Sequence, residues 1–485
     1  MKYLLLSFSF LLSFNGFSQD AEFIHTYEYG GGENILDIQQ TADNGFVAVG
    51  VHTLGIGASR VMLIKTDSLG EEEWHRFYGF PYSNSGRKIR ITPEGDFLIL
   101  ARTSGDTIVA TAENTYIIKT NPQGDTLWTR VFGGDTYPDI GFDLEITPEG
   151  EYLIGGIYRS SSLTGESNIN LIKLDANGNV IYNKILDYSG NQTLLALELS
   201  ENGDMIAGGA IEYNEGFADI YVMKLDEGGD TIWTTSLEWE FVDIVNNLIE
   251  SSDGNILVTG ITSSFRDNVG YDVFFIMLNS QGEILWTKLV GENLNDSSEN
   301  VKDLIALDND EFVWLGRNVY SGGNDIQLQK INAVGEIIWD RRFSEFETGF
   351  EANNLLVKKN GDFVLGGTMD FENTECSVCG AIVMTNEEGL ATDVKDKIVE
   401  LESINIFPNP SDNGNFTITI DAKITKKINI ELYNSIGQTI FQKSENLIYG
   451  KNNISIALTS IPIGHYYLKI SDSFGKVESH VLLIQ

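Results

Sequence analysis

The chain contains seven copies of one repeat, and this periodicity constrains its fold more than any other feature. Each copy has a mostly apolar run that ends in a small residue, and successive runs begin 51 to 56 residues apart. The runs are Phe46–Gly50, Phe97–Ala101, Tyr152–Gly156, Met205–Gly209, Ile256–Gly260, Phe312–Gly316 and Phe363–Gly367. Such a period indicates supersecondary units that pack on one another, because one unit cannot bury both of its faces alone.

A second motif places Asp or Asn three residues before Gly in every repeat. The pairs are Asp67/Gly70, Asn121/Gly124, Asp175/Gly178, Asp226/Gly229, Asn279/Gly282, Asn332/Gly335 and Asn386/Gly389. The first side chain can accept a backbone N–H, and the glycine can adopt the left-handed conformation that closes a hairpin. An aromatic residue follows the turn in six repeats: Trp74, Trp128, Tyr182, Trp233, Trp286 and Trp339. We expect these rings to fill the space between neighbouring units.

Each repeat has room for four short strands. In the third repeat they are expected at 142–147, 152–156, 170–174 and 180–186. Four antiparallel strands in about 50 residues make one blade of a β-propeller. The seventh repeat lacks its aromatic strand, but Phe23–Gly31 near the N-terminus is similar to Trp128–Gly134. We therefore predict an all-β fold with a seven-bladed β-propeller over residues 19–390, whose N-terminal strand completes the last four-stranded blade.

The first residues have the pattern of a secretory signal peptide, predicted at residues 1–18. Lys2 supplies the positive end, a short apolar run follows, and Gly16 and Ser18 are the small residues of a cleavage site. That run is too short to span a bilayer, and no later segment is longer and equally apolar, so no membrane span is predicted.

The charge of the chain is strongly negative and unevenly distributed. The net charge is −38, yet residues 401–485 contain seven acidic and seven basic side chains, so the excess lies before them. Such a field repels phosphate backbones, and no nucleic-acid partner is predicted. An acidic surface of this kind also keeps an exported protein in solution.

Past residue 400 the repeat stops. A linker is predicted at 391–403, and short strand patterns over 404–485 predict a small β-sandwich. The segment contains Phe407-Pro408-Asn409-Pro410, Leu432–Gly437 and Gly464–Lys469. These features resemble the type A C-terminal sorting domain of the type IX secretion system of Bacteroidetes.

This resemblance implies that the secretion machinery is a partner of the C-terminal domain, with Phe407, Pro408, Asn409 and Pro410 as its sorting motif. It implies passage through both membranes, so the protein is expected to be secreted or attached to the outer surface of the outer membrane. The repeats also resemble the uncharacterised propeller-like cargo that is often joined to such tails.

Cys376 and Cys379 are the only cysteines, in a C-x-x-C arrangement. A thioredoxin-like site would need a βαβ context, and a zinc site would need two more ligands that five scattered histidines do not offer. In an exported protein a loop disulfide is the expected state.

The sequence shows no catalytic signature. It lacks H-E-x-x-H, G-x-S-x-G and a phosphate-binding glycine loop. It also lacks a complete calcium loop, so no cofactor is predicted, with calcium left possible.

The first strand of each blade lines the channel of a propeller, and polar residues recur there. Nine residues before each apolar run lie Asp37, Lys88, Asp143, Ala196, Asn247, Asp303 and Asn354. Two residues further on lie Gln39, Arg90, Glu145, Glu198, Ile249, Ile305 and Leu356. We predict a binding site in the channel from eight of these: Asp37, Lys88, Arg90, Asp143, Glu145, Glu198, Asn247 and Asp303. Converging carboxylates can hold a cation, bind sugar hydroxyls or act as an acid–base pair; alternatively, the channel is hydrated and its charges pair across blades.

These observations favour a binding or adhesion module that recognises a glycan or a protein through one propeller face. Variable loops at 103–115, 158–168, 263–271 and 369–380 are expected to gather on one face, where recognition usually resides. One alternative is a carbohydrate-active hydrolase or lyase that uses the channel carboxylates, and another is a passive structural surface protein. Enzymatic activity is the less expected reading, because the catalytic motifs are missing.

Overall fold

A computed structural model describes the chain over residues 24–389 and 401–484, with gaps. The gaps are 56, 105–112, 135–137, 160–166, 189, 215–216, 266–269, 291–297, 321–322, 345–348, 371–377, 412–413, 423–425, 435–438, 448–449, 459–461 and 473–476. The predicted signal peptide, Cys376 and much of the four variable loops lie outside the described residues. All regular secondary structure in the described residues is β-strand, which confirms the all-β class. None of the described segments is a helix that could span a membrane.

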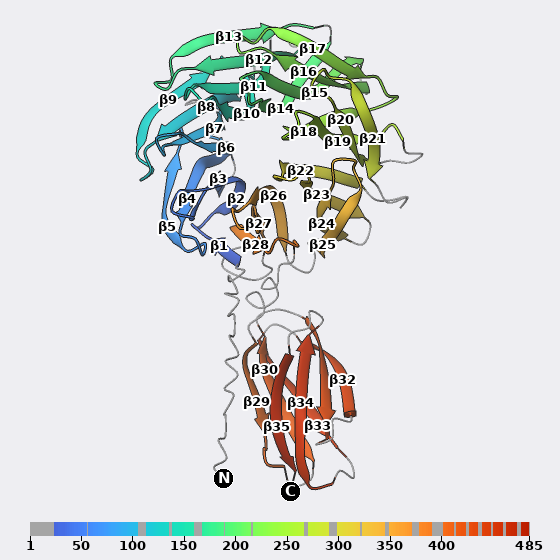
Figure 1. Ribbon diagram of the computed structural model, residues 1–485. Coiled ribbons are helices and arrows are strands. Elements are labelled where there is room, and N and C mark those ends of the chain that lie inside the picture. The colour runs from blue at the N-terminus through green and yellow to red at the C-terminus, as the bar shows by residue number, and fades with distance from the viewer. Residues whose placement is uncertain are drawn as a thin grey trace, which may run out of the picture.

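Seven four-stranded antiparallel sheets occupy the described residues between 24 and 385, and they stand around a common centre (Figure 1). The first sheet contains β2 (Gly32–Gln40), β3 (Phe46–Gly55), β4 (Ala58–Thr66) and β5 (Glu72–Tyr78). The second contains β6 (Asn84–Ile91), β7 (Phe97–Thr103), β8 (Asn114–Thr120) and β9 (Thr126–Phe132). The third contains β10 (Ile140–Ile146), β11 (Tyr152–Arg159), β12 (Ser167–Leu174) and β13 (Val180–Leu186).

The next three sheets follow the same order. The fourth contains β14 (Asn191–Leu199), β15 (Met205–Asn214), β16 (Phe217–Leu225) and β17 (Thr231–Leu237). The fifth contains β18 (Asp243–Glu250), β19 (Ile256–Thr262), β20 (Asp272–Leu278) and β21 (Ile284–Val290). The sixth contains β22 (Ser298–Ala306), β23 (Phe312–Tyr320), β24 (Gly323–Ile331) and β25 (Ile337–Ser344). In each sheet the first strand faces the centre, and we call these the inner strands (Figure 1).

The seventh sheet combines the two ends of this region. It contains β26 (Phe350–Val357), β27 (Phe363–Met369) and β28 (Cys379–Thr385), and β1 (Ile24–Tyr27) pairs with β28 at its outer edge. In this antiparallel pair Ile24 lies opposite Val383 and Tyr27 opposite Gly380.

The apolar core lies in layers between neighbouring sheets. One layer joins Val47 and Leu63 of the first sheet to Ile99 and Ile118 of the second. Since β-branched and other apolar side chains point to both faces of these strands, each sheet contributes to two layers.

The turn glycine of one sheet contacts the recurring aromatic residue of the neighbouring sheet. An added Cβ at Gly178 would lie 2.9 Å from the Trp128 ring of the preceding sheet, and one at Gly124 would lie 2.8 Å from Trp74. The turn of one sheet therefore receives the aromatic residue of the sheet before it. These glycines also have positive φ, +75° at Gly178, which a side chain would strain. The contact confirms that the recurring rings pack between units.

The C-terminal region consists of two sheets that share one core. The first contains β29 (Leu401–Phe407), β30 (Asn415–Ala422) and β33 (Gly450–Ala457). The second contains β32 (Thr439–Leu447), β31 (Lys426–Tyr433), β34 (Gly464–Asp472) and β35 (Val477–Ile484). Ile418 and Ile456 of one sheet pack with Ile430, Leu468 and Leu482 of the other.

Candidate functional site

All seven inner strands contain a β-bulge at the same place. The pairing register shifts between Ile35 and Asp37, Gly86 and Lys88, Gly141 and Asp143, Leu194 and Ala196, Val245 and Asn247, Val301 and Asp303, and Ala352 and Asn354. A bulge inserts one residue and re-aims the side chains beside it. Asp37 and its six equivalents, which precede each apolar run by nine residues, therefore lie directly after a bulge in every sheet.

Three of the predicted aspartates bridge neighbouring inner strands. Asp37 is almost fully buried; its Oδ1 accepts the N–H of Ile38 at 3.0 Å, and its Oδ2 accepts the N–H of Ile89 in the next sheet at 2.8 Å. Both N–H groups belong to inner strands, β2 and β6, and a single carboxylate accepts a hydrogen bond from each of them.

Asp143 and Asp303 make the same pair of contacts. Asp143 accepts the N–H of Leu144 at 3.0 Å and of Leu197 at 2.9 Å. Asp303 accepts the N–H of Leu304 at 2.9 Å and of Leu355 at 2.8 Å. The three carboxylates thus join the first sheet to the second, the third to the fourth and the sixth to the seventh. The second, fourth, fifth and seventh sheets have no carboxylate at this position, and the fifth sheet, with Asn247, is the one that none of the three joins.

Two cations lie among these carboxylates. The Nζ of Lys88 is 3.7 Å from Asp143 Oδ1, and Arg90 Nη1 is 3.3 Å from Asp37 Oδ2. Asp143 raises the pKa of Lys88 against the opposing effect of burial, with Asp37 and Asp303 adding to it. The amide of Asn354 donates to Asp37 at 2.9 Å and to Asp303 at 2.7 Å. The centre of the ring is therefore a network of paired charges.

The residues two positions after Asp37 and its equivalents are polar in the first four sheets and apolar in the last three. Arg90 holds Glu145 through Nη2 at 2.7 Å and Nε at 3.2 Å, both to Oε1. Gln39 and Glu198 continue this polar arc over the first four sheets, whereas the last three sheets present Ile249, Ile305 and Leu356, each half-buried.

Burial shifts the titration of several carboxyls here. Burial raises the pKa of Asp303 to about 6, although Lys88 lowers it. Burial also raises the pKa of Glu145, with Arg90 opposing. For Glu198, burial followed by repulsion from Glu145 raises the pKa well above its ordinary range. Among the described residues the Glu198 carboxyl has no hydrogen-bond or ion-pair partner, and only the attraction of Arg90 opposes this rise in its pKa.

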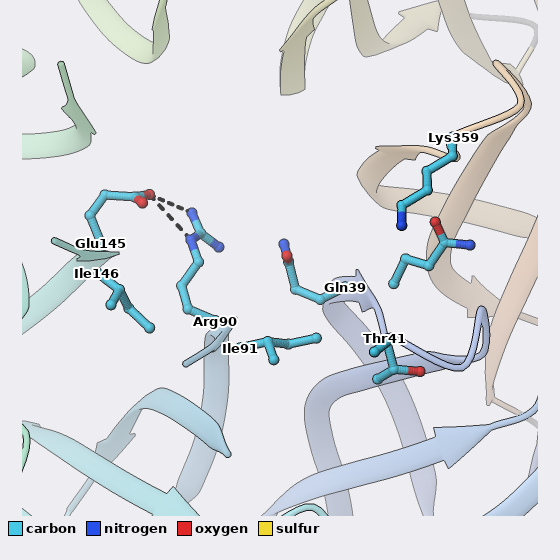
Figure 2. A pocket seen from close by; sticks show the side chains of 9 residues that line it. Gln39, Thr41, Arg90, Ile91, Glu145, Ile146 and Lys359 are labelled. Atoms are coloured by element: carbon cyan, nitrogen blue, oxygen red, sulfur yellow. Dashed lines mark hydrogen bonds and ion pairs between the residues drawn. The ribbon is translucent and has the colours of Figure 1, made fainter. Parts of the chain in front are cut away.

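A pocket of about 470 Å³ opens where the inner strands of the first three sheets end. It is lined by Gln39, Gln40, Thr41, Ala42, Arg90, Ile91, Glu145, Ile146 and Lys359. Figure 2 shows the Arg90–Glu145 pair on one side of it, Gln39 near the middle and Lys359 opposite. A second pocket of about 320 Å³ shares Gln40 and Lys359 with the first. Of the eight predicted residues, only Arg90 and Glu145 line the larger pocket.

The sequence analysis missed the residues inserted by the bulges. They include Arg87, whose guanidinium lies 5.0 Å from the Phe142 ring, and Asn353, whose amide donates to Asn34 at 2.7 Å. Four repeats have two successive polar residues at this place: Arg87-Lys88, Asn246-Asn247, Lys302-Asp303 and Asn353-Asn354. That break in the alternation of a strand was the signal for a bulge.

The structure adds two observations on metal and disulfide sites. Within the described residues, no three His, Cys, Asp or Glu side chains are grouped to hold a metal ion. Cys379 is disulfide-bonded, while Cys376 lies outside the described residues.

The predicted sorting motif joins the start of the C-terminal region to its last strand. The Asn409 amide donates to the carbonyl of Val481 at 2.9 Å and its Oδ1 accepts the N–H of Leu483 at 2.9 Å. Ser411 continues this contact by donating its N–H to the Leu483 carbonyl at 2.9 Å. Phe407 remains 54% exposed, so its ring is available to a partner.

Residues 405–485 match the family model of the secretion system C-terminal sorting domain. This match supports the prediction that the chain is cargo of a type IX secretion system, and it implies interaction with that machinery and export from the cell. No match to a curated protein was found.

Several solved structures show a distant likeness. The Pan2 WD40 domain of Neurospora crassa has 10% identity and a TM-score of 0.36, covering 63% of this chain and 90% of that one. The α-L-arabinanase of Penicillium chrysogenum has 11% identity and a TM-score of 0.40, covering 62% and 93%. A member of the duf4221 family from Bacteroides vulgatus has 10% identity and a TM-score of 0.33, covering 76% and 97%.

Proposed function

We propose that the protein is an exported binding module that recognises a glycan at the pocket between Arg90, Glu145, Gln39 and Lys359. Its scaffold is a seven-bladed β-propeller, in which the seven sheets are the blades and β1 closes the ring. The support for closure is a repeated contact: Tyr27 of β1 donates to the carbonyl of Gly70 at 2.7 Å, as Tyr78 of the first blade donates to that of Gly124 at 2.6 Å.

The proposal extends to the ends of the chain. Residues 1–18 are a signal peptide, 19–390 the propeller, 391–403 a linker and 404–485 a sorting domain of type A, with Cys376 and Cys379 joined in a loop disulfide. The mature protein is then secreted or held at the outer surface of the outer membrane. The basis for type A is the set of sequence motifs that begins with Phe407–Pro410.

The pocket carries the glycan proposal. Its lining combines amide and hydroxyl groups, one fixed ion pair and the apolar Ile91 and Ile146. Sugars present hydroxyls to such polar groups and C–H faces to apolar ones, and small ligands bind in concave sites with a few oriented polar groups. A folded protein partner would need a surface of about 800 Å² on each side, whereas a pocket of about 470 Å³ has the size of a small-ligand site.

The geometry favours binding over hydrolysis. A glycosidase needs two carboxyl groups beside the scissile bond. Asp143 and Asp303 each accept two backbone N–H groups, and Glu145 is held by Arg90, so these groups already support the fold. Of the four carboxyls considered for catalysis, only Glu198 has no hydrogen-bond or ion-pair partner in the described part of the chain, so no two of them are free to act as the pair.

Calorimetric titration of the mature chain with a panel of neutral and charged oligosaccharides tests this proposal. Gln39→Ala and Lys359→Ala are expected to weaken binding of the recognised sugar at least about tenfold, the size of one or two lost polar contacts, without changing the melting temperature. Glu201→Ala, in an exposed turn of the fourth sheet, is the matched control and should bind normally.

Two results would count against the proposal. If no oligosaccharide releases heat on mixing, a protein ligand or a passive structural role takes its place. If the sugar is cleaved, as seen by new reducing ends, and cleavage depends on Glu145 and Glu198, the hydrolase reading is correct.

A further inference from the structure

Two guanidinium groups converge on one aromatic ring at the other end of the inner strands. Arg87 lies on β6 and Arg102 on β7, and their Cζ atoms are 5.0 Å and 5.2 Å from the centre of the Phe142 ring on β10. Arg102 pairs with Ser85, near the start of β6, whereas the pocket of Figure 2 adjoins Ile91 at its end. The two arginines are therefore distinct from the proposed glycan pocket.

The cluster has more positive charge than its neighbours balance. Glu113 accepts from Arg102 Nη1 at 3.0 Å, but the buried Nε of Arg102 has no acceptor within the described part of the chain. Among the described residues, Arg87 has no hydrogen bond and no ion pair; its guanidinium lies over the Phe142 ring, and Glu113 attracts it without contact. Asp143, which is close enough to influence Arg87, already accepts two N–H groups and lies 3.7 Å from Lys88.

The electrostatics of Arg87 reflect this imbalance. Burial, followed by repulsion from Arg102, lowers the pKa of Arg87 to about 10. A guanidinium that is shielded from water and lies close to a second one is unfavourable unless an anion completes its coordination. Guanidinium forks bind the paired oxygens of carboxylate and sulfate groups with two parallel hydrogen bonds.

We propose that Arg87 and Arg102 bind an oxyanion, a carboxylate or sulfate group of an extracellular ligand, between the second and third sheets. The net charge of the chain opposes the approach of anions at long range. At physiological ionic strength, however, such fields are screened beyond about 8 Å, whereas a hydrogen-bonded guanidinium acts at contact. The site therefore selects ligands by close contact rather than by long-range attraction.

Titration of the mature chain with sodium sulfate and with sodium glucuronate, at ionic strength held constant with sodium chloride, tests the site. Saturable binding of at least one is expected, and Arg87→Gln should weaken it at least tenfold. Arg60→Gln, at an exposed arginine of β4 outside both sites, is the matched control and should leave it unchanged. Binding of sulfate alone or of glucuronate alone identifies which group the site accepts.

Absence of saturable binding of both anions would overturn the proposal, as would unchanged binding in both Arg87→Gln and Arg102→Gln. Folding of each variant is checked by circular dichroism. If Arg87→Gln does not fold, Arg87→Lys provides the test: it keeps the charge, loses the fork and is expected to weaken binding. Since the glycan pocket is not involved, failure here leaves the proposed function intact.

Discussion

At the scale of single residues, the carboxyl groups near the centre of the ring differ in whether they have hydrogen-bond or ion-pair partners. Asp37, Asp143 and Asp303 each accept backbone N–H groups from two sheets. Glu198 lies in the same region and has neither a donor nor a cation in contact among the described residues. A buried carboxylate in this position opposes folding when it is ionised, because desolvation and Glu145 both disfavour its charge.

Glu198 should therefore make stability depend on pH. Its pKa is raised in the fold, so between the ordinary value of 4.5 and that higher value the folded state holds more protons, and stability falls as the pH rises. Glu198→Gln is expected to increase the free energy of unfolding by about 1 kcal/mol at pH 8 and to change little at pH 5. Urea unfolding at both pH values measures this, with Glu201→Gln as the exposed control. An equal effect at both pH values would contradict it.

The sequence predicted that Asp37 and its equivalents lie on the first strand of each repeat, but it could not assign their contacts. The spacing from each apolar run identified Asp37 and its equivalents, because the repeat fixes the place of each strand. The bulge was hidden, since two successive polar residues break the alternation only in some repeats. Which aspartate reaches which N–H depends on the distance between neighbouring sheets, and that follows from packing rather than from the order of residues.

At the scale of a strand and its turn, a lysine near the end of the third strand binds an acid in the turn between the first two strands. In the second sheet, Lys119 lies 3.3 Å from Asp96. Equivalent pairs are Lys65–Asp43, Lys173–Glu151, Lys224–Asp204 and Lys330–Glu311. In the fifth sheet both partners change together, to Met277 and Asn255. In the seventh sheet Met384 replaces the lysine while Asp362 is kept, and Asp362 pairs instead with Lys358 at 3.5 Å. The acid directly before the second strand therefore keeps a lysine partner even where the third strand does not supply it.

This covariation gives a prediction for the second sheet. Lys119→Met should destabilise the protein by about 2 kcal/mol, because it leaves Asp96 half-buried without its cation. Adding Asp96→Asn copies the pair of the fifth sheet and should recover at least about 1 kcal/mol, a positive coupling in a double-mutant cycle. Urea unfolding of the four proteins measures this coupling. Simple additivity of the two substitutions would show that the pair does not act as a unit.

At the scale of the whole molecule, we expected seven sheets from the seven repeats, and a pairing of the chain ends from the missing last strand. Both followed from the period and from the similarity between Phe23–Gly31 and Trp128–Gly134. In the structure β1 pairs with β28 at the outer edge of the seventh sheet. The partners of β1 in the first sheet, such as Gly70, could not be identified from the repeat alone, because they depend on the curvature of the whole ring.

If β1 closes the ring, a mature chain that begins at Gly32 should be weakened as a whole. It loses the ladder to β28 and buried Tyr27, whose ring alone is worth about 3 kcal/mol. The open edge of β28 should then pair with other chains, so the truncated protein is expected to melt at lower temperature and to self-associate in sedimentation experiments. A peptide of residues 19–31 should reverse both effects by adding the missing strand. If the truncated chain stays monomeric and equally stable, β1 pairs with the seventh sheet but is not needed to close the ring.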